Sequence, residues 1–419
     1  MIALSALLLV LAVFGAPLFA VIAASAMIGF NSEDIDLMSV AIEIAGIAGM
    51  PFLSAIPLFT FAGYLLSESN APGRLVRLSG ALLGWLPGGL ALVALAACAF
   101  FTAFTGASGV TIIALGAILY PALRQDGYPE NFNLGLVTTS GSLGLLFAPS
   151  LPLILYGVVA EVSIDDLFRA GVLPGLLMLV LLSAYSLWTG QRSDQQTEKF
   201  SWKKLGRALH ESRWELPLPI VVLGGIYSGF FAVSEAAAIT ALYVLIAEVF
   251  VLREVPLKEL PRIMRESMLL VGGILIILAV SLASTNYMID AGVPQRLLEY
   301  VAGFVDSQAS FLLLLLVFLL ILGAILDIFA AIVLVVPLIL PIAAQYDVNP
   351  IHLGIVFLAA MQLGYLTPPV GLNLFIASYR FDKPIMQVYM ATLPFLLILM
   401  LSVVVIAYWP SLSLFLVGG

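Results

Sequence analysis

Apolar runs long enough to cross a membrane recur along the whole chain. A helix needs about 20 predominantly apolar residues to span a hydrocarbon core of about 30 Å. The pattern predicts helical segments at residues 2–29, 53–68, 78–104, 107–123, 133–160, 168–189, 214–232, 235–252, 264–288, 310–326, 328–345, 351–378 and 388–416. We therefore expect an all-α polytopic membrane protein.

Composition supports this class. The 419 residues are 62% hydrophobic and 10% charged, with a mean hydropathy of +1.13, whereas charged residues make up about a quarter of a soluble domain. Of the 17 Lys and Arg residues, most fall in residues 190–213 and 253–265, which the positive-inside rule places in the cytoplasm. The residues between these two loops are then expected to cross the membrane twice, around the turn GGIYSGFFAVSEAAA (224–238).

Three local features are assigned ordinary roles. The first segment lacks a positive n-region, so it is expected to be a membrane helix and not a signal peptide. Residues 189–215 form the only long hydrophilic stretch and are expected to lie at the cytoplasmic interface as an amphipathic linker. Cys98 is expected to be a buried small hydrophobe, and the two histidines do not form a metal site.

The two halves of the chain resemble each other when one is shifted onto the other by a constant offset. This offset places LGLLFAPSL (143–151) on LGYLTPPVG (363–371) and Pro121 on Pro341. In each half, two apolar runs around a short polar break precede a long apolar run that is interrupted by proline. Such paired interruptions indicate a secondary transporter with two repeats, each with a re-entrant hairpin and an interrupted helix.

The interruptions expose backbone oxygen. A proline provides no N–H to the carbonyl four residues earlier, so we expect free carbonyls at Leu145, Ala148, Gly364 and Tyr365. Carbonyl and hydroxyl oxygens suit a hard cation such as Na⁺. The alternative is a proline kink that shapes packing and binds nothing.

Polar residues near the breaks are candidates for the same chemistry. Asp327 has apolar sequence on both sides; it could associate with a cation, cap a hairpin exposed to a water-filled vestibule, or pack in its protonated form. Thr105 and Ser108 are its counterparts in the first half, where packing is the alternative role. Glu235 is expected to cap a helix. No nucleotide-binding or catalytic motif appears, so energy must come from an ion gradient or another subunit, and no enzyme activity is expected.

Several long strings resemble the large membrane (M) subunit of TRAP, or tripartite ATP-independent periplasmic, transporters. They are IPLFTFAGYLLSESNAPGRLVRL (56–78), LPGGLALVALAACAFFTAFTGASG (86–109), GSLGLLFAPSLPLILYGVVAEVSIDDLFRAGVLPG (141–175), GGIYSGFFAVSEAAA (224–238) and TPPVGLNLF (367–375). The resemblance implies the ion-transporter-superfamily fold with two inverted repeats and elevator-type transport. It also implies Na⁺ coupling, a bacterial inner-membrane location, a separate small four-helix membrane subunit, a periplasmic substrate-binding protein and a small carboxylate-type substrate.

The resemblance further implies a division of the chain. Residues 1–77 would be scaffold helices, 78–188 the first hairpin and interrupted helix, and 189–215 the linker. Residues 216–306 would be scaffold and arm helices, 307–380 the second hairpin and interrupted helix, and 381–419 the C-terminal helix.

It also implies the site residues. The Na⁺ ligands would come from Thr105, Gly106, Ala107, Ser108, Gly109, Ser142, Gly144, Pro149, Gly323, Asp327, Gly364, Thr367 and Gly371. The substrate would lie near Ser108, Ser150, Thr367, Pro368 and Asn373.

The chain departs from the family's sequence pattern at two places, and two alternative functions remain open. The family often has SGSS at the first hairpin tip, where this chain has TGAS, and a proline and threonine before the glutamate where this chain has AVSE. The first departure leaves the individual ligands of the first Na⁺ site open. The alternatives are a stand-alone ion-coupled carboxylate carrier of the same fold and a structural membrane subunit of a redox or ion-pumping complex.

Overall fold

The structure is a computed structural model that describes residues 7–417 except 9, 12, 13, 51, 52, 87 and 191–199. Parts of the predicted first segment and of the 189–215 linker lie outside the described residues. Every regular element in the described part is helical, which confirms the all-α prediction.

The helices follow in chain order with short connections. The first half contains α2 (Leu18–Ser32), α3 (Met38–Gly46), η1 (Ile47–Gly49), α4 (Ala55–Ser67), α5 (Ala71–Leu83), α6 (Gly89–Thr105), α7 (Ser108–Ala114), α8 (Gly116–Gln125), α9 (Glu130–Ser140), η2 (Leu143–Leu146), α10 (Leu151–Val159) and α11 (Ile164–Gly190). The second contains α12 (Trp202–Glu211), α13 (Pro217–Tyr227), α14 (Val233–Leu245), η3 (Ile246–Val251), α15 (Leu260–Asp290), α16 (Val293–Ala302), α17 (Gln308–Gly323), α18 (Ile328–Gln345), α19 (Pro350–Gly364), α20 (Leu372–Phe381), α21 (Ile385–Tyr408) and α22 (Pro410–Leu414).

Five helices in the described part are long and apolar enough to cross a membrane, or six if the bent pair of α9–η2 and α10 is one span. The chain is therefore a multi-pass membrane protein. The prediction of two crossings between the basic loops is only half supported. Val233–Val251 is long enough, but α13 has 11 residues, which is about 17 Å and too short to span the hydrocarbon core alone.

One predicted segment is divided in the structure, and two helices were not predicted. The segment expected at 78–104 is two helices, α5 and α6, because the chain turns between them through Gly88 at φ +82°. Helices α3 and α16 fall where no helix was predicted. Both are short, so neither carries the long apolar run on which the prediction relied.

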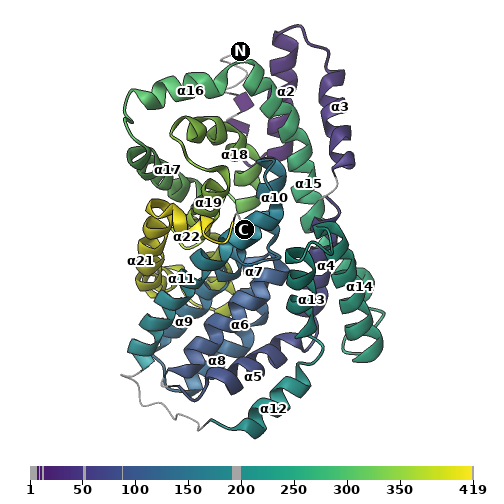
Figure 1. Cartoon of the computed structure of the whole chain (residues 1–419), viewed down its shortest axis with the longest axis vertical. Coiled ribbons are helices and arrows are strands. Elements are labelled where there is room, and N and C mark those ends of the chain that lie inside the picture. Colours follow the sequence, from purple (N-terminus) through teal and green to yellow (C-terminus); the bar gives the residue numbers. More distant parts are fainter. Residues whose placement is uncertain are drawn as a thin grey trace.

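The repeat predicted from the sequence is present in the element order. The offset that places Pro121 on Pro341 also takes the start of α7 at Ser108 to the start of α18 at Ile328, and the start of α9 at Glu130 to that of α19 at Pro350. It brings α5 close to α16. These two equivalent helices lie at opposite ends of the molecule in Figure 1, as inverted repeats require.

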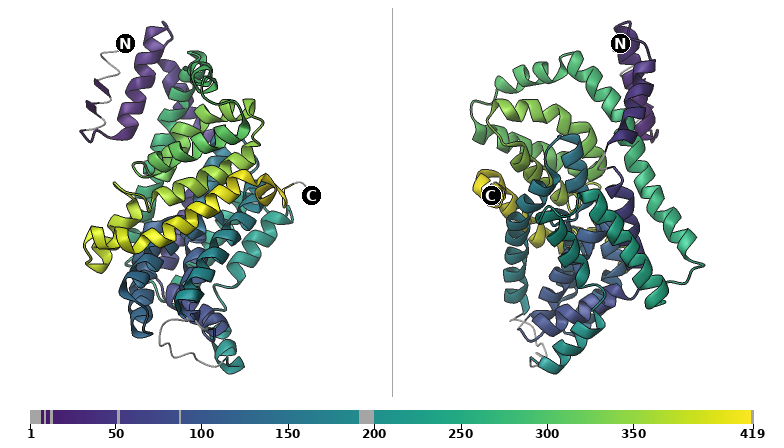
Figure 2. Two further views of the ribbon diagram at one scale, coloured as in Figure 1. Left: turned by 90° about the vertical axis from the view of Figure 1, so that its left-hand side faces the viewer. Right: turned by 45° about the vertical axis from the view of Figure 1, so that its right-hand side comes forward.

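The helices form two groups. Helix α15 packs against α2, α3 and α4, and α14 packs against α4, along one side of the molecule (Figure 1; Figure 2, right). The hairpins α6–α7 and α17–α18 pack with α9, α11, α19 and α21 in the other group. Helix α4 contacts α6, and α15 contacts α18, so the two groups touch along the hairpins.

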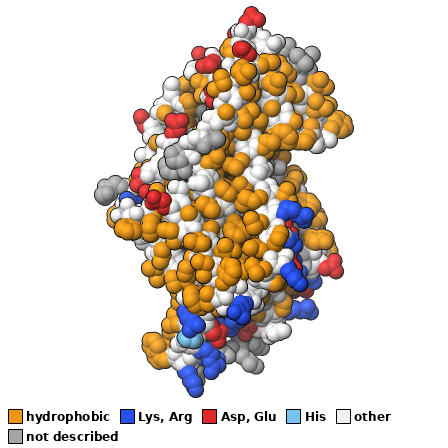
Figure 3. All heavy atoms as spheres, turned by 90° about the vertical axis from the view of Figure 1, so that its right-hand side faces the viewer, with side chains coloured by type: hydrophobic (Ala, Val, Ile, Leu, Met, Phe, Trp, Pro, Cys, Tyr) orange, Lys and Arg blue, Asp and Glu red, His pale blue; other side chains and the backbone are white. Residues whose placement is uncertain are grey.

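The surface fits a molecule that lies in a bilayer. In Figure 3 hydrophobic side chains cover the broad middle, Lys and Arg gather at the end where α12 lies, and acidic side chains mark the opposite end. The end where α12 lies is called the basic end below.

Close helix contacts give a test of the packing. A Cβ on Gly135 of α9 would lie 2.1 Å from the carbonyl oxygen of Ala391 in α21, whereas a Cβ on Gly272 of α15 would meet nothing within 4 Å. We expect Gly135→Ala to destabilise the chain by about 1–3 kcal/mol because the backbones must separate. Gly272→Ala is the matched control and should be neutral or slightly stabilising. Thermal unfolding in detergent measures both; equal stability of the two variants would contradict this packing.

Candidate ion and substrate site

The tip of the first hairpin lies against the first helix break. Helix α6 ends at Thr105 and α7 begins at Ser108, and Gly106 turns the chain between them at φ +64°. A Cβ on Gly106 would lie 2.5 Å from Cγ of Leu151, the first residue of α10 after the break. Only glycine permits both the left-handed backbone and this approach.

The first break is itself buried against the first hairpin. The chain leaves α9 after Ser140, forms the short η2 and resumes as α10 at Leu151. A Cβ on Gly144 would lie 2.3 Å from the carbonyl oxygen of Ala99 in α6. The hydroxyl of Thr102, also in α6, donates to the carbonyl of Gly141 at 2.9 Å. The structure therefore brings together the two segments expected to form the first Na⁺ site.

Three hydroxyl oxygens in this region have no hydrogen-bond partner. They belong to Thr105 at the hairpin tip, Thr139 at the end of α9 and Ser150 at the break, and all three side chains are 0% exposed. A buried hydroxyl without a partner costs free energy. Oxygen atoms of this kind are suitable ligands for a hard cation, so this donor set fits the expected Na⁺. Sequence analysis missed Thr139; Ser142, which was expected, instead donates to the Thr139 carbonyl at 3.3 Å.

The second hairpin meets the second break in the same way. A Cβ on Gly364 would lie 2.4 Å from Cα of Gly323, the last residue of α17. The N–H of Gly371, at φ +54°, donates to the carbonyl of Ala324 in the hairpin tip at 3.3 Å. Each break also contains a cis peptide bond, at Ala148–Pro149 and Pro368–Pro369.

Two carbonyls expected to be free have partners. The carbonyl of Gly364 accepts from the N–H of Thr367 at 3.0 Å, and that of Tyr365 accepts from the N–H of Asn373 at 3.2 Å. The expectation was wrong here because the chain turns sharply after α19 and brings later N–H groups to these oxygens. Each carbonyl keeps a second lone pair, so a cation contact is still compatible with this geometry.

Asp327 caps the second helix of the hairpin. Its Oδ2 accepts from the N–H of Phe329 at 3.0 Å, at the start of α18. Its Oδ1 accepts from the hydroxyl of Tyr365 at 2.9 Å. The same hydroxyl oxygen of Tyr365 accepts from the N–H of Ile328 at 3.1 Å. The residue is exposed at the surface. This geometry matches the hairpin cap among the three roles considered, and it leaves the exposed carboxylate open to a cation.

Tyr365 was missed by the sequence analysis. It is buried, and it joins the second break to the second hairpin through Asp327. The available signal was a phenol group inside an otherwise apolar segment, because a buried tyrosine hydroxyl usually has a hydrogen-bond partner.

The two repeats exchange contacts near the first hairpin tip. The hydroxyl of Ser108 donates to Oδ1 of Asn373 at 2.7 Å, and both residues are buried. Helix α7 of the first hairpin packs on α20, and α18 of the second hairpin packs on α10. A Cβ on Gly109 would lie 2.6 Å from Cδ1 of Ile376. Two of the expected substrate residues thus meet across the repeats.

The other expected substrate residues lie at the breaks. Ser150 is buried in the first break. Thr367 is half-buried, its hydroxyl donates to the carbonyl of Leu363 at 2.9 Å, and Pro368 is exposed. The second break is therefore partly exposed at the surface, whereas the first break is buried.

The sequence of this chain is similar to those of known transporter proteins. Residues 2–412 match the family model described as "Tripartite ATP-independent periplasmic transporter, DctM component". The chain is 33% identical over 402 residues to the C4-dicarboxylate TRAP transporter large permease protein of Rhodobacter capsulatus, covering 92% of this chain and 91% of the relative. It is 32% identical over 415 residues to the ectoine/5-hydroxyectoine TRAP transporter large permease protein of Ruegeria pomeroyi, covering 98% of this chain and 96% of the relative.

A further relative is longer than this chain, and one solved structure shows the fold. The chain is 33% identical over 398 residues to the isethionate TRAP transporter permease protein of Oleidesulfovibrio alaskensis, covering 94% of this chain but only 62% of that relative. The crystal structure of the Alcanivorax borkumensis YdaH transporter matches with a TM-score of 0.63 at 13% identity, covering 89% of this chain and 87% of that one.

The match to the family model and to these permeases runs over nearly the whole chain, both repeats included. The chain belongs to the tripartite ATP-independent periplasmic transporter family, as its DctM component, the large membrane permease.

Proposed function

We propose that this permease translocates organic acids by Na⁺-coupled, elevator-type alternating access in a bacterial inner membrane. A periplasmic binding protein delivers the solute. A small four-helix membrane subunit, a separate chain, assembles with the permease. The observation that carries the proposal is the pairing of each hairpin tip with a helix break, together with the three unpartnered hydroxyls at the first pair. Paired interruptions of this kind are typical of ion and substrate sites in secondary transporters.

Na⁺ would be held by this chain's own oxygens. In the first site the hydroxyls of Thr105, Thr139 and Ser150 are available without breaking any hydrogen bond. In the second site the Asp327 carboxylate and the second lone pairs of the Gly364 and Tyr365 carbonyls are available. Na⁺ entry down a potential of 100 mV contributes about 2.3 kcal/mol per charge, which can drive uptake against a gradient.

The substrate is proposed to be a small carboxylate. The R. capsulatus relative is named for C4-dicarboxylates. The hydrogen-bonded pair of Ser108 and Asn373 joins the first hairpin to the helix that follows the second break. A hydroxyl and a carboxamide can both donate to a carboxylate, and the N-terminal ends of α7 and α20 favour negative charge.

Transport in liposomes tests the proposal as a whole. The permease, assembled with its small membrane subunit and supplied with its binding protein, should take up a labelled C4-dicarboxylate when an inward Na⁺ gradient is applied. Replacement of Na⁺ by choline should abolish uptake. Uptake that is equal in choline would contradict Na⁺ coupling, and uptake without the binding protein would favour a stand-alone carrier.

Thr105→Val tests the first Na⁺ site. Valine has nearly the same shape as threonine, and the Thr105 hydroxyl has no partner to lose, so the variant should fold with unchanged or higher stability. If the hydroxyl binds Na⁺, the Na⁺ concentration for half-maximal uptake should rise on the order of tenfold or more. Thr240→Val is the matched control, because the Thr240 hydroxyl donates to the Ala236 carbonyl in α14, far along the chain from both breaks. An unchanged Na⁺ requirement in Thr105→Val would remove this residue from the site.

Asp327→Asn separates a cation contact from capping. Asparagine is an equally good N-cap, so α18 and the thermal stability should be preserved. Loss of the negative charge should still raise the Na⁺ concentration for half-maximal uptake on the order of tenfold. If Asp327→Asn retains the wild-type Na⁺ dependence while Asp327→Ala lowers stability by about 1 kcal/mol, Asp327 is a cap only.

A further inference from the structure

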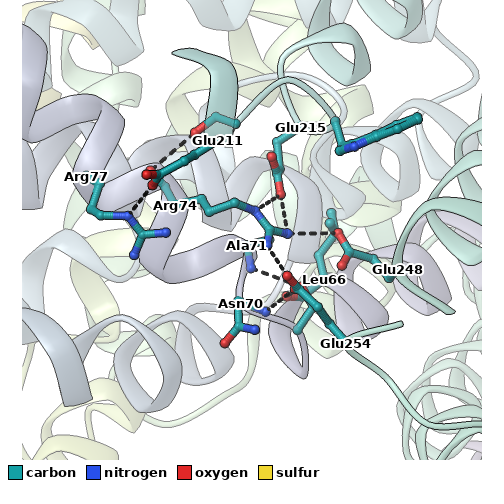
Figure 4. Close-up of polar contacts among 12 residues, drawn as sticks. Leu66, Asn70, Ala71, Arg74, Arg77, Glu211, Glu215, Glu248 and Glu254 are labelled. Atoms are coloured by element: carbon teal, nitrogen blue, oxygen red, sulfur yellow. Dashed lines mark hydrogen bonds and ion pairs between the residues drawn. The ribbon is translucent and has the colours of Figure 1, made fainter. Parts of the chain in front are cut away.

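A buried group of charged residues lies apart from both breaks, at the basic end of the molecule. The Arg74 cluster consists of Arg74 in α5, Glu215 just before α13, Glu248 in η3 and Glu254 in the following loop (Figure 4). Arg74 Nη2 lies 2.5 Å from Oε1 of Glu215 and 3.4 Å from Oε1 of Glu248, and Nη1 pairs with Glu254. One guanidinium therefore holds three segments that are distant in sequence.

The charges in this cluster do not balance. Three carboxylates face one guanidinium, and the side chains of Arg74, Glu215 and Glu248 are only 7%, 2% and 2% exposed. Oε2 of Glu215 and Oε2 of Glu248 are buried without any hydrogen-bond partner. Two ionised carboxylates against the same nitrogen repel each other, and each uncompensated buried charge is costly.

Neighbouring groups do not supply the missing positive charge. On α5, Arg77 donates to Glu211 of α12 at 2.8 Å on the exposed side. In α15, Arg262 pairs with Glu68, Glu259 and Glu266. The hydroxyl of Tyr243 in α14 donates to the Trp214 carbonyl, and that of Ser212 donates to the Arg74 carbonyl at 3.3 Å. Within the described residues, no second Lys or Arg pairs with the three glutamates of the cluster.

A proton fits this position better than a metal ion. Nowhere in the part of the chain that the structure describes are three or more His, Cys, Asp or Glu side chains arranged to hold a metal. A proton on one carboxylate needs no coordination shell and removes the repulsion between the two charges.

We propose that the Arg74 cluster binds one proton, on Glu215 or Glu248, and that this proton helps to hold α5 against the start of α13 and η3. The site lies outside the proposed Na⁺ and substrate sites and does not depend on them. Since α5 connects α4 of one helix group to α6 of the other, the proton influences how firmly the connection between the groups is held.

The environments of the glutamates support a division of roles. Burial would raise the pKa of Glu254, but hydrogen bonds from Arg74 and from the Asn70 N–H at 2.8 Å keep that pKa below its ordinary value. Burial raises the pKa of Glu215 even though Arg74 acts in the opposite direction. Glu254 is therefore the charged partner of Arg74, and Glu215 belongs to the pair that takes up the proton.

The sign of the pH effect follows from the raised pKa. A carboxyl group with a raised pKa in the folded state binds more protons folded than unfolded, so its contribution is full at low pH and is lost as pH rises through the folded-state pKa. Glu254 has the opposite sign, but its loss occurs at acidic pH, below its ordinary value of about 4.3. Above the ordinary glutamate pKa of about 4.3, we expect the cluster to lose stability as pH rises through this raised pKa.

Infrared spectroscopy of the full-length chain in detergent tests proton binding directly. At neutral pH the wild type should show the C=O stretching band of a buried protonated carboxyl group. Glu215→Gln and Glu248→Gln imitate the protonated side chain, so each should fold and should reduce or remove that band. Glu211→Gln is the matched control, because Glu211 forms an exposed ion pair between α5 and α12, and it should leave the band unchanged.

Thermal unfolding at several pH values provides the second measurement. The melting temperature of the wild type and of Glu211→Gln should fall as the pH rises, and this fall should disappear in Glu215→Gln or Glu248→Gln. A band that persists in both cluster variants, or failure of both to fold, would overturn the proposal. The proposal would also be overturned if the wild-type melting temperature differed between Na⁺ and choline and this difference disappeared in Glu215→Gln or Glu248→Gln. None of these measurements uses transport, so failure of the proposed Na⁺ coupling would leave them interpretable.

Discussion

The structure depends on one constraint: a polar backbone or side-chain group inside the bilayer must have a partner. A broken helix violates this constraint unless protein or an ion covers it. Here each break is covered by a hairpin at backbone contact, which is possible only because glycine lies at the contact. Gly144 faces the Ala99 carbonyl, and Gly364 faces Gly323. The hydroxyls without partners at the first contact then mark the place where covering by protein is incomplete.

The exchange of contacts between repeats has a mechanical consequence. The second helix of each hairpin packs on the helix that follows the break in the other repeat, α7 on α20 and α18 on α10. Ser108 and Asn373 add a hydrogen bond across the same boundary. These contacts join each hairpin to the break of the other repeat. The proposed ion and substrate sites would then move together, as the proposed elevator movement requires.

The sequence predicted the architecture better than the contacts. Long apolar runs and the constant offset between the halves predicted an all-α membrane fold with two repeats, because each signal extends over many residues. Short helices such as α3 and α16 were missed, since a few turns carry little periodicity. The carbonyls of Gly364 and Tyr365 were wrongly expected to be free, because local proline rules cannot show which later N–H group returns to them. Tyr365 and the Arg74 cluster were missed for a related reason. Each depends on residues far apart in the chain, such as Arg74 and Glu248, which only the fold brings together.

The two breaks differ in a way that the repeat alone does not explain. Residues 148–150 of the first break are buried, whereas residues 368–370 of the second are exposed. The repeats have the same element order, so element order does not account for the difference. Inverted repeats in one asymmetric arrangement necessarily place equivalent segments in different environments. In an alternating-access transporter such an asymmetry can be reversed, because the two repeats can exchange environments when one group of helices moves past the other. The closed first break and open second break therefore fit one end state of the movement proposed for this permease.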